Sequence, residues 1–282
     1  MANTACESTV VEMEKGPLAA ASGPKVFLCC VEPSTRWRLP PLYAGDDVRH
    51  KTDFVSLTHS LFSRSLKGAP TASVPRASIN SIGAILYELF QNTHDWARAD
   101  VNGRTLRPSV RGIAIERHSR LPTEVAPVLE NNPRLAEHFQ HAGSDGRIKT
   151  IELNIFDSGV GLAARWLKQK PTDSLSLDDE HKACIECLTY RHTTASSPGR
   201  GIGLFCVLSA VAELRGLLRI RTGRLALYRD FANYTQDSII DPTRPMLNDW
   251  TTGDQTLTAM SRVEGTLFTM LIPIQQPQSR KV

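Results

Sequence analysis

Residues 78–96, SINSIGAILYELFQNTHDW, carry the clearest structural signal in the chain. Mostly apolar residues recur there at steps of three and four, which places them on one face of a helix. These residues are Ile79, Ile82, Leu86, Leu89, Thr93 and Trp96. The spacing predicts a long helix from about Pro75 to Ala99, with one face buried and Ser78 as its N-cap.

A polar stripe lies beside that apolar face. At ~100° per residue, Glu88, Asn92 and Asp95 fall within roughly 60° of one another around the helix axis. Two carboxylates and a carboxamide in line suit a hydrated Mg²⁺ ion and a polarised water, because magnesium prefers oxygen ligands and keeps most of its waters. The same stripe also fits an ordinary solvated helix face, so the pattern alone leaves both interpretations open.

A second candidate segment follows a strand that alternation predicts at residues 148–156. It reads DSGVG over residues 157–161. A carboxylate at a strand end, followed by two glycines, makes a turn in which a ligand can approach the backbone closely. Turn chemistry alone would also explain these residues.

A third segment, GRGIGL over residues 199–204, opens a helix expected at residues 202–214. Glycine-rich entry to a helix exposes backbone N–H groups at the positive end of the helix dipole, which suits phosphates. Its spacing is neither the Rossmann fingerprint nor a Walker loop. A fourth segment, Gly265-Thr266-Leu267-Phe268, begins the last strand, expected at residues 266–274.

The elements around these segments indicate the fold class. Strands are expected at residues 26–31 and 110–116, a weak helix at 54–66, a short helical insertion at 121–141, and a hairpin of 217–222 with 225–229. Residues 162–200 and 232–262 are polar and are expected to be irregular. Several strands with helices on one side predict an α+β sandwich of two layers.

In this order, the four segments resemble the motifs of the GHKL ATPase superfamily. That superfamily includes DNA gyrase, the ninety-kilodalton heat-shock chaperones, sensor histidine kinases and the MutL mismatch-repair proteins. Residues 88–95 look like its N-box, residues 157–161 like its first glycine box, residues 199–204 like its second, and Gly265-Thr266 like its closing threonine motif. The resemblance implies a two-layer α/β sandwich of the Bergerat type over residues 76–275.

The resemblance also implies residue roles. Glu88 would be the general base that polarises the attacking water, and Asn92 would ligate the Mg²⁺ that bridges the ATP phosphates. Asp157 would accept a hydrogen bond from the adenine N6 amino group. Asp95 would support the water network beneath the nucleotide, and Thr266 would reach the adenine through a water. Further ATP contacts would come from Gly159, Gly161, Thr193, Thr194, Ser196, Gly199, Arg200, Gly201, Ile202, Gly203 and Leu204.

The function implied is that of a Mg-ATP-binding protein, an ATP-hydrolysing nucleotide switch that acts with a separate protein partner. Residues 162–198 would form the ATP lid. Two alternatives stay open: a protein kinase of the histidine-kinase or anti-sigma type, and an ATP-binding scaffold without hydrolysis.

His59 is the only candidate phosphoacceptor in a helical stretch, and Ser60 follows it where an acidic residue is usual. The sequence runs out directly after the last strand, with no room for a second domain that would send a lysine to the γ-phosphate, so we expect a partner.

Composition sets the remaining expectations. The net charge of +4 over 282 residues does not indicate a nucleic-acid binder. Six cysteines are too sparse for a disulfide scaffold, and no apolar stretch is long enough to span a membrane, so a cytoplasmic protein without a membrane partner is expected. Residues 1–24 and 276–282 would be tails, and residues 25–75 an N-terminal extension. The spacing of His181, Cys184, Cys187 and His192 is unusual for zinc, which favours structural thiols.

Overall fold

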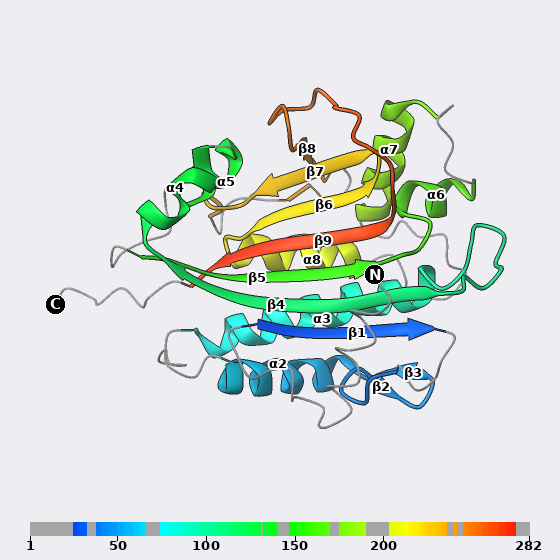
Figure 1. Cartoon of the computed structure of the whole chain (residues 1–282), viewed down its shortest axis with the longest axis horizontal. Helices are drawn as coiled ribbons and strands as arrows, with labels where there is room; N and C mark the ends of the chain where they lie inside the picture. Colours follow the sequence, from blue (N-terminus) through cyan, green and yellow to red (C-terminus); the bar gives the residue numbers. More distant parts are fainter. Residues whose placement is uncertain are drawn as a thin grey trace.

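The computed structural model describes residues 25–32, 38–65, 74–130, 132–139, 147–169, 175–189, 203–235, 240–241 and 245–274. Within these residues, an antiparallel sheet of seven strands forms one layer (Figure 1). Its strand order is β1 (Lys25–Glu32), β4 (Ser109–Arg120), β5 (Ile148–Asp157), β9 (Val263–Pro273), β6 (Leu217–Gly223), β7 (Leu225–Asp230) and β8 (Asn248–Asp249). A separate small ribbon pairs β2 (Tyr43–Ala44) with β3 (Asp47–Val48).

The described helices are α2 (Lys51–Ser65), α3 (Arg76–Trp96), α4 (Pro122–Glu130), α5 (Pro133–Phe139), α6 (Leu162–Leu167), α7 (Leu177–Leu188) and α8 (Gly203–Glu213). Helices α2, α3 and α8 form a second layer, whereas α5 lies on the other face of the sheet, where its Leu135 and Phe139 pack on Leu217 and Leu271. In Figure 1, α3 and α8 lie behind the sheet and α2 lies beside α3 near β1. The buried face of α3, including Ile82, Leu86 and Leu89, packs in one core cluster with Leu153 and Ile155 of β5. The apolar period of the sequence therefore makes the contact between the two layers.

Most of the expected elements are confirmed. The long helix is α3, the strands expected at 26–31, 110–116, 148–156 and 266–274 are β1, β4, β5 and β9, and the hairpin is β6–β7. The expected N-cap is wrong. Pro75 precedes the first helical residue with no side-chain cap, and Ser78 lies inside the first turn of α3. Proline suits this end of a helix because its fixed φ is compatible with the first turn.

The polar segment after β5 is not irregular throughout, as the sequence suggested. It contains α6 and α7, and Ser176 caps α7 by accepting a hydrogen bond from the Asp179 backbone N–H at 3.0 Å. Cys184 and Leu188 are buried on the inner face of α7. Acidic residues fill its first turn, where they interact favourably with the helix dipole. They also make the segment polar, which is why the sequence pattern did not predict a helix here.

Residues before α3 take part in both layers. β1 pairs along its length with β4, so the edge strand of the sheet comes from the part of the chain expected to be an extension. α2 packs against α3 and so contributes to the helical layer. The loop expected at 232–262 also contributes a short strand, β8, beside β7. Across the described ranges, no helix combines the length and apolar character that crossing a bilayer would require.

Candidate nucleotide site

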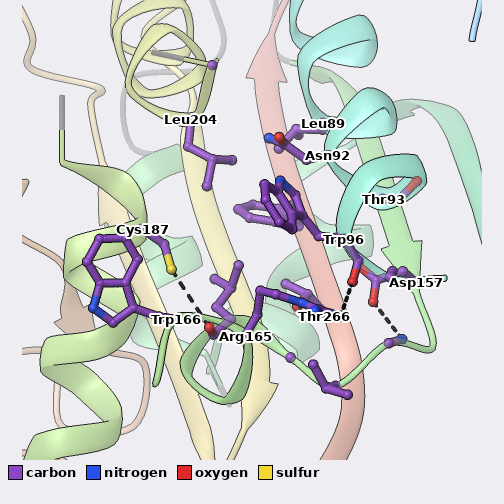
Figure 2. A pocket seen from close by; sticks show the side chains of 17 residues that line it. Leu89, Asn92, Thr93, Trp96, Asp157, Arg165, Trp166, Cys187, Leu204 and Thr266 are labelled. Carbon is purple, nitrogen blue, oxygen red and sulfur yellow. Dashed lines mark hydrogen bonds between the residues drawn. The ribbon is translucent and has the colours of Figure 1, made fainter. Parts of the chain in front are cut away.

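A cavity opens at the carboxyl end of β5, where α3, α6, α7, α8 and β9 converge (Figure 2). Seven of the residues expected at an ATP site line it: Asn92, Asp157, Gly159, Gly161, Gly203, Leu204 and Thr266. They come from four segments that are far apart in the sequence, and the fold brings them together around one space. Its walls are completed by apolar side chains, as is usual for small-molecule sites.

Asp157 is the carboxylate in the lining of this cavity. Its Oδ1 accepts a hydrogen bond from the Gly159 backbone N–H at 2.8 Å. Burial raises the pKa of Asp157 to about 6, although the backbone N–H groups of Gly159 and Thr266 and the charge of Arg111 lower it. A desolvated carboxylate fixed by backbone donors is suited to accept one further hydrogen bond from a ligand.

The closing strand reaches Asp157 through sheet pairing. Thr266 of β9 lies opposite Asp157 of β5 in the antiparallel register. Gly265, directly before it, has φ +76°, and a Cβ there would lie 1.8 Å from the Asp157 carbonyl oxygen. Only glycine fits this combination of positive φ and close approach. The backbone geometry therefore explains why glycine precedes Thr266 at this position.

Thr222 joins the two glycine turns and was not anticipated from the sequence. Its Oγ1 donates to the Gly265 carbonyl at 3.1 Å and accepts from the Leu162 backbone N–H at 3.2 Å. It also lies 3.3 Å from the Thr266 hydroxyl. Thr222 is buried at the end of β6, and only the three-dimensional pairing of β6 with β9 reveals its role.

Asn92 projects from α3 into the cavity, and its amide nitrogen has no hydrogen-bond partner in the part of the chain that the structure describes. Its Nδ2 is buried, and no other described residue makes a hydrogen bond with it. Buried polar atoms in proteins are nearly always paired, so such an atom needs an explanation. A ligand with oxygen atoms in the cavity would supply the missing partner.

Glu88 and Asp95 do not line the cavity, unlike Asn92. Glu88 lies beside its rim, where a Cβ at Gly203 would be 2.9 Å from Glu88 Oε2, and its Oε1 pairs with Lys51 Nζ at 3.0 Å. The Asp95 carboxylate accepts a hydrogen bond from Gln91 Nε2 at 2.9 Å. The helical wheel placed the three on one stripe, but only Asn92 faces the cavity directly.

Trp96, Arg165 and Trp166 also line the cavity, although the motifs did not include them. Arg165 donates to the Trp96 carbonyl at 2.6 Å and to the Ala99 carbonyl, and its guanidinium lies 5.9 Å from the centre of the Trp96 ring. It thereby ties α6 to the end of α3. The helical period of the sequence had placed Trp96 on the buried face, and Figure 2 shows the ring at the cavity.

A buried polar cluster fixes the end of α3 from the other side. Arg111 of β4 is fully buried and donates to Glu32 at 2.8 Å and to the Tyr43 hydroxyl at 2.7 Å. The Tyr43 hydroxyl lies 3.2 Å from His94 Nδ1, and burial lowers the pKa of His94 to about 4. His94 is therefore neutral at physiological pH. Removing one member would leave a buried charge or dipole unpaired.

Part of the expected site lies outside the described residues. This holds for Thr193, Thr194, Ser196, Gly199, Arg200, Gly201 and Ile202. Of the second glycine box, Gly203 and Leu204 are described, and they form the first turn of α8. Of the expected lid, residues 162–169 and 175–189 are described.

Two further hypotheses from the sequence concern His59 and the two cysteines of α7. His59 Nε2 lies 2.8 Å from Asn80 Oδ1 on the contact between α2 and α3, away from the cavity. Burial raises the pKa of Cys187 to about 12 and that of Cys184 well above its ordinary value. His192, the last member of the pattern, lies outside the described residues. Among the residues that the structure places, no cluster of metal-ligating side chains is found.

Comparison with known proteins assigns no family. No family model matches the chain, and no curated protein sequence matches it. The function is therefore inferred from the residues around the cavity and from the order of the motifs.

Proposed function

We propose that this protein binds Mg-ATP in the cavity and hydrolyses it, as a GHKL-type nucleotide switch that acts with a separate protein partner. The observation that carries the proposal is the convergence of Asn92, Asp157, Gly203 and Thr266 on one cavity. Each comes from a different motif. The antiparallel sheet, with α2, α3 and α8 layered on one face, is compatible with the Bergerat type of fold that we propose here.

The Asp157 end of the cavity suits the adenine base. The carboxylate is already held by backbone N–H groups and keeps acceptor capacity for the N6 amino group. Guanine carries an oxygen at the corresponding position, which would face the carboxylate without a shared proton. Trp96 and Phe268 supply apolar surface for the ring. The geometry therefore favours adenine over guanine.

The α8 end of the cavity suits the phosphates. α8 begins at Gly203 and runs for 11 residues, so its N-terminal N–H groups and dipole favour a bound anion. Asn92 stands beside it with an amide nitrogen, Nδ2, that has no hydrogen-bond partner among the described residues. The Asn92 carbonyl oxygen is a suitable ligand for Mg²⁺, which would neutralise phosphate charge when bound.

The experiment that tests this function is a reaction with ATP labelled on the γ-phosphate, in the presence of Mg²⁺. We expect slow release of labelled inorganic phosphate by the purified chain and no label on protein. Label transferred to a protein would point to the kinase alternative, and ATP binding without release would leave the scaffold. Neither binding nor release would overturn the proposal.

The raised pKa of Asp157 predicts a pH dependence of binding. Below about pH 6 the carboxyl is protonated, and the charge-assisted hydrogen bond to the amino group is lost. ADP affinity should be constant above about pH 7 and fall by up to about tenfold per pH unit below about pH 6. Titration calorimetry measures the dissociation constant for ADP at each pH, with correction for the protonation of free ADP. An unchanged dissociation constant down to about pH 5 would count against this role of Asp157.

A further inference from the structure

Lys51 forms an ion pair with the proposed general base. Its Nζ donates to Glu88 Oε1 at 3.0 Å, across 37 positions of sequence. The Lys51 side chain is 49% exposed and that of Glu88 is 23% exposed. Exposed ion pairs contribute little to folding stability. A contribution to folding stability therefore does not explain this ion pair.

The position of Lys51 is set by the packing of α2 on α3. The two helices run antiparallel, with Val55 against Gly83 and His59 against Asn80. A Cβ at Gly83 would lie 2.7 Å from the Val55 Cα, so the backbones approach as closely as glycine permits. Lys51 lies one turn before Val55 and follows the same line of contacts. Its backbone is therefore fixed opposite Glu88.

The two carboxylate oxygens of Glu88 have different surroundings. Oε1 is held by Lys51, while Oε2 lies against Gly203, where a Cβ would be 2.9 Å away. Gly203 lines the cavity and begins α8. The hydrogen bond from Lys51 to Oε1 therefore leaves Oε2 next to the end of the cavity that suits the phosphates.

We propose that Lys51 is a positioning residue that holds Glu88 in the orientation needed for hydrolysis, an inference that rests on the proposed function. In that reaction Glu88 Oε2 accepts a proton from water as the water oxygen bonds to the γ-phosphorus. The bond from phosphorus to the β–γ bridging oxygen breaks, which leaves ADP and inorganic phosphate. A glutamate without this anchor has several side-chain rotamers, and misplacement of a catalytic group lowers the rate.

The test compares Lys51→Gln and Lys51→Arg with the wild type in phosphate release, and measures ADP affinity in parallel. Lys25→Gln is the matched control, because Lys25 also pairs with a glutamate, Glu116, at 3.4 Å, on a strand of the sheet. We expect Lys51→Gln to lower kcat by on the order of tenfold or more while the Kd for ADP changes less than about threefold. Lys51→Arg should restore much of the rate, and Lys25→Gln should match the wild type.

A double variant separates positioning from a direct phosphate contact. In a Glu88→Gln background, Lys51→Gln should cause no further loss of the residual rate, because its effect acts through Glu88. A wild-type kcat in Lys51→Gln would overturn the inference, as would a loss seen mainly in nucleotide affinity. If the wild-type protein binds ATP but releases no phosphate, the inferred role of Lys51 is overturned and the proposal of an ATP-binding site still stands. Absence of ATP binding overturns the proposed function as well.

Discussion

Replacing Asp157 by asparagine is expected to weaken ATP binding by about 100-fold or more. The carboxylate accepts from backbone N–H groups, and in the proposed function it also accepts from the adenine amino group. An asparagine presents one oxygen and one NH₂, so a donor would face a donor on one side. A hydrogen bond to a charged group contributes about 1.5–3 kcal/mol, and a buried unsatisfied donor adds to the loss. Titration calorimetry with Mg-ATP measures the effect.

The folded state of this variant provides its own control. Burial raises the pKa of Asp157 above its value in the unfolded chain, so the ionised carboxylate destabilises the fold as pH rises through about 6. The neutral amide removes this cost but accepts from fewer backbone N–H groups, so the melting temperature at about pH 7 should stay close to that of the wild type. Asp254→Asn, at a carboxylate outside the cavity lining, is the matched variant and should bind ATP normally. Wild-type affinity in Asp157→Asn would remove the base-recognition role.

Replacing Glu88 by alanine or glutamine is expected to abolish turnover and preserve binding. General-base groups contribute about 10²-fold to 10⁴-fold to rates, whereas Glu88 lies at the rim and does not line the cavity. The Kd for ATP should therefore stay within about threefold of the wild type. Phosphate release at saturating Mg-ATP measures the first effect and calorimetry the second.

Glutamine is the sharper of the two substitutions, because it keeps the size of the side chain and can still accept from Lys51. Glu116→Gln removes a comparable carboxylate from the sheet, where it pairs with Lys25, and should retain full turnover. Phosphate release at the wild-type rate in Glu88→Gln would show that another group activates the water.

Local patterns in the sequence were enough to predict most of the fold. The period of α3, the alternation in β5 and the Gly223-Arg224 turn are each set by neighbouring residues, and the structure confirms all three. α7 was missed because only a few of its residues are buried and its first turn is acidic. The edge position of β1 depends on pairing with β4, a contact between distant parts of the chain that no local pattern contains.

The candidate site also contains residues that local motifs predict and residues that only long-range packing places. Motif spacing identified Asn92 and Asp157, and the register of β5 with β9 places Thr266 opposite Asp157. Lys51 carried no such signal, because a lysine at the start of a polar helix is common, and only the packing of α2 on α3 places it at Glu88. Trp96 was read as a core residue, since a cavity wall and a core face show the same apolar period.

The most direct test of the central claim is calorimetric titration of the wild-type chain with ATP, with and without Mg²⁺, and with GTP as competitor. We predict one site per chain with a Kd between about 1 μM and 1 mM, tighter binding when Mg²⁺ is present, and at least about tenfold preference for ATP over GTP. No saturable binding of ATP, or equal binding of both nucleotides, would contradict an adenine-nucleotide site built on Asn92 and Asp157.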